Sequence, residues 1–506
     1  MKKVLLLIIS TVIYLFFTQS LMAQVGDSEA QPALQNSNEA VFEAGPTMNS
    51  NRLRHHAVLL PDGRVALLGG IREGFNSLNT AEIFDPVEGT FTTLTMQYIH
   101  DSPALARMND GRYLIAGGSR NLGIPSYDQT EIFDPADLSF TSTDTMVRFR
   151  ASAGAAALND GRVVIASAWW NHNNAHTYGE LYDPVTGSFS EIGPFSISRS
   201  LAAVIPTNDG KALVVGGRRP TGNWENMPVE EFNPQTGAIS TIHEYIIEQD
   251  EVWSFSNNQG ITAYQKLNDD SYMWLAQNRG SSDTIYFKLI TIDPETKSVE
   301  VFQTTPSLPD SESFMFLGQP VIDNENDRAY LIARVMDTES YAIAAFTVDL
   351  ATGSLTESSN IHYTETYELR SAPPVLLNDG RIFVSGGSVS NNFDAVNNTL
   401  FITPPEPVAT SAGREQEVPQ KVKLHQNYPN PFNPVTQISF ELTEIAHTQL
   451  DVFDVTGRNV AQLIDETKPA GRHTVQFDAS HLSTGVYVYR LTTPTGILTR
   501  KMVLVK

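Results

Sequence analysis

Residues 58–70 read VLLPDGRVALLGG, and residues 81–86 read AEIFDP. In the first segment two apolar runs flank Pro61-Asp62-Gly63, a turn in which glycine accepts the positive φ that a tight hairpin demands. After a variable loop, the second segment predicts a third strand, which ends where Asp85-Pro86 begins another turn. The unit therefore predicts antiparallel strands, and no helical periodicity competes with this interpretation.

The same pair of segments recurs along the chain. The hairpin pattern returns as ALARMNDGRYLIAGG (104–118), AAALNDGRVVIASA (155–168), AVIPTNDGKALVVGG (203–217) and PVLLNDGRIFVSGG (374–387), with weaker copies at 264–277 and 320–334. Counterparts of AEIFDP lie at 130–135, 179–184, 229–234, 289–294, 345–350 and 399–404. The sequence thus contains seven units, and the first four recur about every 50 residues.

Each unit predicts a four-stranded antiparallel sheet, because a turn such as Asp183-Pro-Val-Thr-Gly187 is followed by one more short strand. Seven such sheets indicate an all-β, seven-bladed β-propeller over residues 38–404. The small residues of Ala151–Ala157 suit a first strand near the axis, where sheets converge. The seventh unit lacks a fourth strand, so we expect residues 40–45 to supply it and close the ring.

The unit also resembles a known family. Arg54-His-His-Ala57, the DGR turn, Gly69-Gly70, AEIFDP and Phe91 look like the kelch motif, and the arrangement is similar to the central domain of galactose-oxidase-like proteins. That resemblance implies a propeller. Enzymes of this family use copper and a tyrosine crosslinked to cysteine, and the chain contains no cysteine. Galactose oxidase activity is therefore excluded, and we expect neither a cofactor nor a metal.

The ends of the chain predict export. Lys2 and Lys3, an apolar run and small Ala23 are typical of a secretory signal peptide over residues 1–23, cleaved after Ala23. No second apolar run of that kind follows, so we expect no transmembrane segment after cleavage. Residues 24–37 form an N-terminal segment, and the Pro-, Glu- and Gln-rich residues 405–423 form a linker.

Residues 424–506 alternate apolar and polar side chains in short strands and predict a small Ig-like β-sandwich. They resemble the type A C-terminal sorting domain of the type IX secretion system, through NYPNPFNP, DVTGR, FDAS, GVYVYR and the terminal KMVLVK. The resemblance implies recognition by the outer-membrane translocon, then release or attachment at the cell surface. We assign the sorting function to Gly457, Arg458, Gly485, Lys501 and Lys506.

Charge and motifs exclude several functions. With 34 basic and 57 acidic side chains the net charge is −23, which disfavours nucleic acid as a partner. No nucleophile elbow, HExxH helix or phosphate-binding loop occurs. Asp323, Glu325 and Asp327 alternate as in a calcium loop but lack its glycine and its final glutamate, so we interpret them as a solvated turn. His55 and His56 fall on a first strand and are expected to be packed.

The loops between second and third strands are longer than the other turns, as is typical of binding loops on a rigid scaffold. Aromatic rings that stack on sugars, together with hydrogen-bonding donors, concentrate in two of these loops and at the start of the next unit. The candidate ligand-binding residues are Trp169, Trp170, His172, His176, Tyr178, Arg218, Arg219, Trp224 and Trp253. Trp169 and Trp170 could instead cap the core of the third unit. The spacing of His172 and His176 gives only weak support for a metal site.

These observations favour a secreted or surface-exposed binding protein for a glycan or another surface protein over an enzyme. Two alternatives stay open. One is a carbohydrate-active hydrolase, lyase or mutarotase on the same propeller, because carboxylate pairs in space are invisible in a sequence. The other is a structural component of the cell surface.

Overall fold

The computed structural model describes residues 39–505 with gaps at 120–127, 169–176, 218–227, 244–264, 280–284, 305–312, 317–319, 337–340, 351–354, 358–361, 365–371, 390–393, 405–421, 425–426 and 428–431. The predicted signal peptide and the segment 24–37 lie outside these residues. Within the described ranges, no helix has the length and apolar character needed to cross a membrane. The only helix there is one 3-10 turn, Glu73–Phe75, so the expected all-β class is confirmed.

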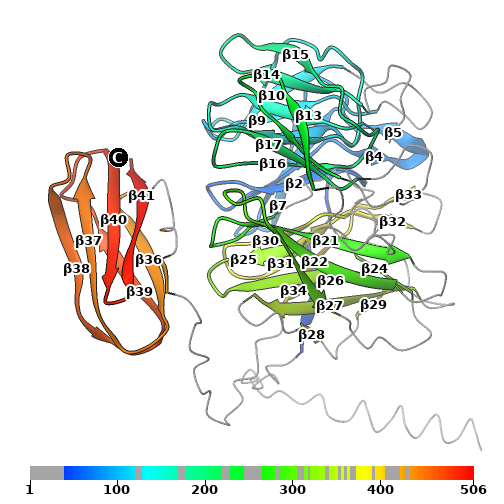
Figure 1. Ribbon diagram of the computed structural model, residues 1–506. Helices are drawn as coiled ribbons and strands as arrows, with labels where there is room; N and C mark the ends of the chain where they lie inside the picture. Colours follow the sequence, from blue (N-terminus) through cyan, green and yellow to red (C-terminus); the bar gives the residue numbers. More distant parts are fainter. Residues whose placement is uncertain are drawn as a thin grey trace, which may run out of the picture. The chain divides into compact units, whose positions relative to one another are not determined.

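Four sheets follow one another in the first half of the chain, and each has four antiparallel strands (Figure 1). Sheet 1 consists of β2 (His56–Leu59), β3 (Val65–Leu68), β6 (Thr80–Asp85) and β7 (Thr90–Thr95). Sheet 2 consists of β8 (Ala104–Arg107), β9 (Tyr113–Ala116), β10 (Thr130–Asp134) and β11 (Ser139–Ser142). Sheet 3 consists of β12 (Gly154–Ala157), β13 (Val163–Ala166), β14 (Gly179–Asp183) and β15 (Ser188–Ile192). Sheet 4 consists of β16 (Ala203–Pro206), β17 (Ala212–Val215), β18 (Val229–Phe232) and β19 (Ile239–His243).

Three further sheets follow, and their pairing is less uniform. Sheet 5 consists of β20 (Gln265–Lys266), β21 (Tyr272–Arg279), β22 (Ile285–Ile292) and β23 (Val299–Thr304). Sheet 6 consists of β24 (Ser313–Phe316), β25 (Val321–Asp323), β26 (Arg328–Met336), β27 (Tyr341–Asp349), β28 (Leu355–Glu357) and β29 (His362–Thr364). Sheet 7 consists of β30 (Pro374–Leu376), β31 (Ile382–Ser385), β34 (Thr399–Thr403) and β1 (Val41–Ala44).

Sheet 6 differs from the four strands expected of its unit. β24 and β25 both pair with β26, and β28 and β29 both pair with β27. The two central strands have nine residues each, long enough for two short strands to pair along one of them. Pro320, which has no amide hydrogen to donate, directly precedes β25.

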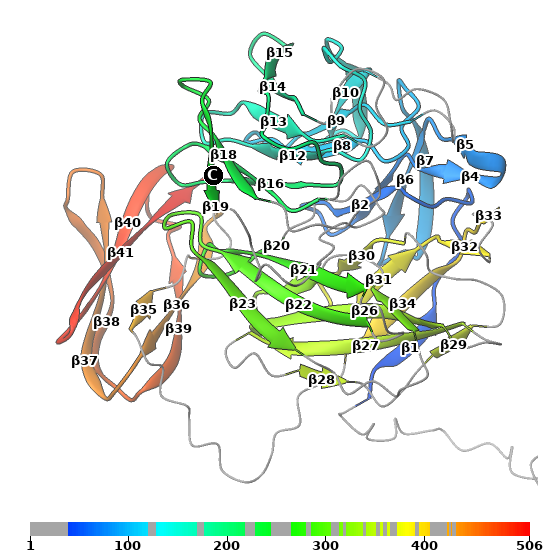
Figure 2. The same ribbon diagram turned by 45° about the vertical axis from the view of Figure 1, so that its right-hand side comes forward.

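The fourth strand of sheet 7 comes from the opposite end of the described chain. β1 pairs antiparallel with β34, and Val41 lies opposite Thr403 while Ala44 lies opposite Leu400. Figure 2 shows the two strands side by side, β1 in blue and β34 in yellow. Ala40 is fully buried in the cluster that joins sheets 6 and 7, so this segment contributes to the core as well as to the ladder.

Hydrophobic clusters join each sheet to the next in chain order. One cluster spans sheets 1 and 2, and others span sheets 2 and 3, 3 and 4, 4 and 5, 5 and 6, and 6 and 7. A further cluster joins sheet 7 back to sheet 1, where the rings of Phe84 and Phe383 stack with centroids 4.5 Å apart. The packing between sheets therefore runs in a cycle.

The short hairpins are held by a repeated side-chain contact. In the turn between β2 and β3, the Asp62 carboxylate accepts the backbone N–H of Arg64 and both Nε and Nη2 of its guanidinium, at 2.8 and 2.6 Å for the latter two. Asp110–Arg112, Asp160–Arg162 and Asp379–Arg381 repeat the arrangement. The intervening glycine has φ near 90°, as at Gly63, which a side chain would strain.

Two small hairpins complete this region. β4 (Ile71–Arg72) pairs with β5 (Asn76–Ser77), and β32 (Ser388–Val389) pairs with β33 (Asp394–Ala395). They lie between the second and third strands of sheets 1 and 7 respectively.

The C-terminal module is a separate group of strands with its own core. One sheet has β35 (Lys423–Leu424), β36 (Val435–Leu442) and β39 (Gly471–Asp478); the other has β38 (Asn459–Lys468), β37 (Ala446–Asp454), β40 (Gly485–Thr493) and β41 (Gly496–Leu504). Side chains from both sheets form one cluster, which includes Phe440, Leu450 and Tyr489. Asn427 of the NYPNPF motif donates its N–H to the Tyr489 hydroxyl at 2.8 Å, which links two of the sequence motifs.

Candidate functional site

The turns that lead into the first strands of sheets 1–4 share an unusual backbone conformation. A non-glycine residue with left-handed φ lies at the same place in each turn: Arg54 (61°), Ser102 (51°), Ser152 (52°) and Leu201 (60°). This conformation costs an L-residue on the order of 1 kcal/mol and is often found at functional sites. We refer to these four residues as the inner-turn arc.

The residues of the inner-turn arc are neighbours in space. Ser152 donates its N–H to the carbonyl of Ser102 at 2.8 Å, and Leu201 donates its N–H to the carbonyl of Ser152 at 3.1 Å. Arg54 reaches across from sheet 1 and donates from Nε to Ser102 Oγ at 3.1 Å. Backbone hydrogen bonds thus join the arc residues of sheets 2, 3 and 4, and the Arg54 side chain links sheet 1 to them.

Double glycines let the arc pack closely against the adjoining sheets. Gly70 donates its N–H to the carbonyl of His100 at 2.7 Å, and Gly118 does the same to Arg150 at 2.8 Å. A Cβ on Gly118 would lie 2.9 Å from the carbonyl oxygen of Asp101, closer than real Cβ atoms approach. Asp101 lies in the turn that leads into the first strand of the same sheet, so glycine is required here by the close approach of that turn as well as by φ.

The residue two positions before each arc residue forms a buried ion pair or a histidine–carboxylate contact, and these pairs were not predicted from the sequence. Arg52 contacts Glu82 at 2.8 Å, with both side chains fully buried. Arg150 and Glu180 make the same pair in sheet 3, and Arg199 and Glu230 make it in sheet 4. In sheet 2 the cationic position is His100, whose Nε2 lies 2.9 Å from Glu131. A regular spacing in the sequence could have revealed these pairs. In each of the first four units, an arginine or histidine precedes the glutamate of the EIFDP-like segment by 30 or 31 residues.

The glutamates also hold backbone from the preceding loop. Glu180 accepts N–H bonds from Val147 at 2.7 Å and Arg148 at 3.1 Å. Its partner Arg150 donates to the carbonyls of Ser167 and Tyr178, both at 3.1 Å. Burial lowers the pKa of Arg150, and the Glu180 carboxylate opposes that shift. In sheet 4, burial lowers the pKa of Arg199 to about 10, against the opposing effect of Glu230.

Arg54 is the one charged member of the inner-turn arc. Its Nε lies 3.2 Å from Asp101 Oδ1, and its side chain is 18% exposed while that of Asp101 is 2% exposed. Ser102 and Ser119 donate hydroxyl hydrogen bonds to the same carboxylate, at 3.0 and 2.6 Å. In the part of the chain that the structure describes, no side chain or backbone group pairs with the two terminal nitrogens of Arg54. Asp101 therefore orients a guanidinium that keeps donors available.

His55 and His56 are fully buried, as expected for packed side chains. His55 Nε2 lies 2.9 Å from Ser385 Oγ, and His56 Nε2 lies 2.9 Å from the carbonyl of Pro103. Burial holds the pKa of His55 well below its usual value and lowers the pKa of His56 to about 4. Both imidazoles are therefore neutral near pH 7.

One of the nine candidate binding residues lies in the described part of the chain. Tyr178 is half-buried at the start of the third strand of sheet 3, and the Arg148 guanidinium lies over its ring, 4.3 Å from the centroid. Arg148 also pairs with Glu191. Val147 and Phe149, beside it in the chain, are 56% and 40% exposed. The other eight fall outside the described residues: Trp169, Trp170, His172, His176, Arg218, Arg219, Trp224 and Trp253.

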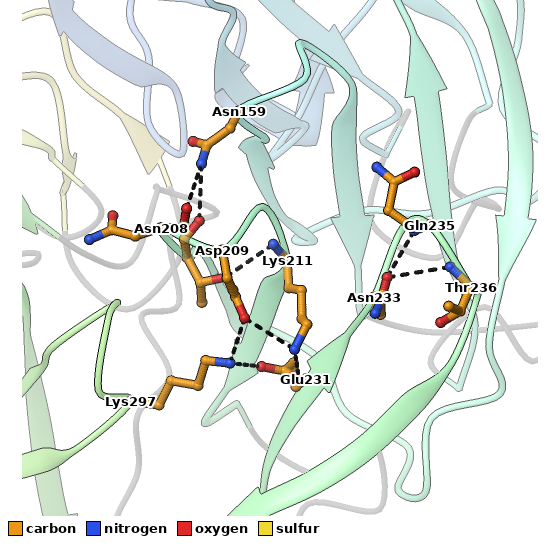
Figure 3. Close-up of polar contacts among 10 residues, drawn as sticks. Asn159, Asn208, Asp209, Lys211, Glu231, Asn233, Gln235, Thr236 and Lys297 are labelled. Atoms are coloured by element: carbon orange, nitrogen blue, oxygen red, sulfur yellow. Dashed lines mark hydrogen bonds and ion pairs between the residues drawn. The ribbon is translucent and has the colours of Figure 1, made fainter.

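A second charged cluster lies at the opposite ends of the strands, in the hairpins of sheets 4 and 5 (Figure 3). Lys211 contacts Asp209 at 3.1 Å and Glu231 at 2.9 Å, and Lys297 from sheet 5 contacts the same two carboxylates. Hydrogen bonds from Thr207 and both lysines lower the pKa of Asp209 despite the opposing effect of burial. Because its cations and carboxylates are mutually paired, this cluster is an inter-sheet clamp.

The calcium-like stretch forms a turn. Asp323 Oδ1 accepts the backbone N–H groups of Glu325 and Asn326, and its Oδ2 accepts the Tyr330 hydroxyl at 3.1 Å. Over the described ranges, no group of three or more histidine, aspartate or glutamate side chains is arranged to hold a metal ion.

The sorting residues lie on turns and edges of the C-terminal module. Asp454 accepts the N–H groups of Thr456 and Arg458 and contacts Arg458 Nε at 3.0 Å, while Gly457 has φ 85°. The hydrogen bond from Thr456 contributes most to lowering the pKa of Asp454, to about 2. Gly485 begins β40, Lys501 lies on β41 opposite Val488, and Lys506 falls outside the described residues.

Comparison with known proteins assigns the C-terminal module. Residues 426–506 match the secretion system C-terminal sorting domain family. The expected sorting domain is thereby confirmed, and it implies recognition by the type IX secretion system and export to the medium or the cell surface. None of the curated protein sequences compared with the chain matches it.

Among solved structures, the chain is similar to a fungal alcohol oxidase of the AA5 family, determined in complex with copper. The identity is 14%, the TM-score is 0.54, and the match covers 92% of this chain and 100% of the oxidase. The likeness concerns the β-rich fold alone. The crosslinked cofactor of galactose-oxidase-like enzymes needs a cysteine, and the chain has none, so its residues do not fit that group.

Proposed function

We propose that the chain is an exported binding protein whose seven sheets form a closed, seven-bladed kelch-type β-propeller. Two observations support the ring: hydrophobic clusters join consecutive sheets, and one of them joins sheet 7 to sheet 1. β1 completes sheet 7 and leaves β34 without an open edge, which is how propellers avoid exposed ladders. The C-terminal module would then be an Ig-like sandwich of two sheets around one core.

The domain bounds follow from this proposal. The signal peptide covers residues 1–23 and is cleaved after Ala23; the propeller covers residues 38–404, with its closing strand at 40–45. A linker of residues 405–423 leads to the sorting domain at 424–506. The propeller is the part of the exported protein left to act outside the cell, because the sorting domain serves delivery.

Ligand binding takes place over the inner-turn arc. The observation that carries this proposal is the orientation of the Arg54 guanidinium by Asp101. A guanidinium held at Nε by Asp101 presents its remaining donors in a fixed plane, which suits carboxylates and hydroxyls. Tyr178 and Arg148 add an aromatic and cationic surface on sheet 3. A glycan that carries uronic acids or vicinal hydroxyls, or an acidic segment of a surface protein, has the complementary groups.

A glycan array probed with the exported chain tests this function. We expect saturable binding that falls at least about tenfold in Arg54→Ala, since a hydrogen bond to a charged group contributes on the order of 1.5–3 kcal/mol. Arg64→Ala is the matched control, because Arg64 lies in a hairpin at the other end of the strands, and it should bind normally. Trp169→Ala and Trp224→Ala test two of the candidate binding residues predicted from the sequence.

Equal binding by the wild-type chain and Arg54→Ala would refute the assigned site. Turnover of a bound glycan would favour the enzyme alternative over a binding protein. If the array is silent, capture of surface proteins from the same organism, compared between wild type and Arg54→Ala, decides whether the partner is a protein.

A further inference from the structure

At one end of the four-stranded sheet in the sorting domain, the outer face is largely apolar and solvent-exposed. Along β40, Tyr487, Tyr489 and Leu491 point into the core, so Val486 and Val488 point to the opposite side, because side chains alternate along a strand. The second sheet of the module packs on the core side. The side that carries Val486 and Val488 is therefore the outer face.

Strand register extends this apolar surface to the neighbouring strands. Val486 lies opposite Val503 on β41, and Val488 lies opposite Phe453 on β37. Residues directly opposite one another share a face. Val455 and Val505 follow at the same end of these strands. The apolar outer face thus consists of Phe453, Val486, Val488, Val503 and Val505, together with Val455 in the turn after β37. Lys501, which pairs with Val488, lies on the same side of the sheet.

The exposure of this face is high for a small module. Val455 is 75% exposed, Val486 is 43% exposed and Val505 is 41% exposed. Of the ten large hydrophobic side chains exposed in the described part of the chain, six belong to this module. Contiguous exposed apolar surface on an exported protein indicates an interaction site, since it otherwise favours aggregation.

Charge distinguishes the same module from the rest of the chain. Residues 426–506 contain seven basic and seven acidic side chains, for a net charge of zero, whereas the whole chain carries −23. Basic groups lie beside the apolar outer face: the Arg490 guanidinium lies 4.2 Å from the centroid of the Phe453 ring, and Arg458 has a side chain that is 78% exposed. Arg490 Nε is buried and has no hydrogen-bond partner among the described residues.

We propose that the apolar outer face docks the sorting domain onto the component of the type IX translocon that recognises it. This inference rests on the delivery role implied by the family match. The partner surface would be apolar with acidic side chains at its border, which complements the valines together with Arg458 and Arg490. A partner of that kind would discriminate against the strongly acidic remainder of the chain.

Export from a bacterium with a type IX system tests the docking face. The double variant Val455→Asp, Val486→Asp places two charges on the face at positions that are already solvent-exposed. We expect the amount of full chain released or displayed to fall about tenfold or more, with accumulation in the periplasm, because charges at the centre of an interface cost several kcal/mol.

The matched control is Ile445→Asp, Ile497→Asp. These side chains are 72% and 61% exposed and lie at the opposite end of the strands from the six residues of the face, although Ile497 shares their side of the sheet. This control variant should export at the wild-type level. Purified variants must unfold at wild-type temperature, which separates lost recognition from lost folding. If the double variant unfolds, Val455→Ser, Val486→Ser replaces it, with an expected smaller decrease in the same direction.

Deletion of residues 426–506 separates the two levels of the proposal. If the deletion leaves export intact, the delivery role itself fails. If the deletion blocks export while the folded face variant exports normally, the docking face is wrong and the delivery role stands. A face variant that exports normally but changes the oligomeric state of the purified chain would assign the face to a second copy, against the translocon.

Discussion

Sheets 1–4 and sheets 5–7 bury different side chains at one equivalent position of the third strand. In the first four sheets this position, the second of the six-residue AEIFDP-like segment, is a buried glutamate: Glu82, Glu131, Glu180 and Glu230. At the equivalent register of the last three sheets it is Ile290, Phe346 and Leu400, and all three are fully buried. The same fold therefore accepts either an ion pair or an apolar side chain at one position.

The difference indicates what the ion pairs contribute. Burying two charges costs desolvation that their attraction often only offsets, so apolar replacements can be equally stable. The glutamates, however, also accept backbone N–H groups from the loop that enters their own unit, as Glu82 does from Asn49 and Ser50. An apolar side chain cannot do this. We infer that the pairs fix the loops behind the inner-turn arc, while apolar contacts suffice elsewhere.

The largest change in stability is expected when one partner of a buried ion pair is removed. Glu180→Ala should destabilise the chain by about 3–5 kcal/mol, because it leaves Arg150 charged and buried and orphans two backbone N–H groups. Urea denaturation of the exported chain measures the loss. The double variant Arg150→Met, Glu180→Leu should recover much of the stability, as sheets 5–7 suggest. A single variant as stable as wild type would show that the pair has no structural role.

An intermediate effect is expected from pH. The pKa of His56 is lowered to about 4, mainly by burial, whereas the unfolded chain has the ordinary value of 6.5. The unfolded state thus binds the proton first as pH falls, so this contribution is complete above pH 6.5 and is lost toward pH 4. The loss is on the order of 3 kcal/mol.

The pH effect can be isolated with His56→Gln, which keeps a side-chain donor near Pro103. The dependence of unfolding free energy on pH between 4 and 6.5 should be shallower in this variant than in wild type. Parallel curves for the two proteins would contradict a neutral, buried His56.

The smallest effect concerns the boundary between the two groups of sheets. Lys297 has φ 61° at a turn position that is glycine in sheets 1, 3 and 4, and it joins Asp209 and Glu231 across sheets 4 and 5 (Figure 3). Lys297→Ala keeps the backbone strain and loses the ion pairs, so we expect destabilisation of about 1 kcal/mol, decreasing with salt. Lys297→Gly relieves the strain and should be close to neutral. A Lys297→Ala variant as stable as wild type would mean that the clamp contributes nothing, and equal effects of the two variants would mean that the left-handed φ carries no strain.

Local chemistry made much of this protein predictable. The DGR and DPxxG turns, together with short apolar runs, placed the hairpins, because turn type depends on residues only a few positions apart. The same reasoning placed a strand at residues 40–45, and β1 occupies 41–44. Coincident motifs over the last 80 or so residues identified the sorting domain, which the family match confirmed.

Only the tertiary structure determined which side chains from distant parts of the sequence contact one another. Arg52 and Glu82 are 30 residues apart, and nothing local to either residue requires a buried pair. Arg54 meets Asp101 only because two sheets bring their turns together, and Val486 joins Phe453, Val488 and Val503 in one face only through strand register. The sequence determined the repeat and its turns, since these depend on neighbouring residues. Contacts between distant segments depend on how the sheets pack, so the inner-turn arc and the docking face emerged only in three dimensions.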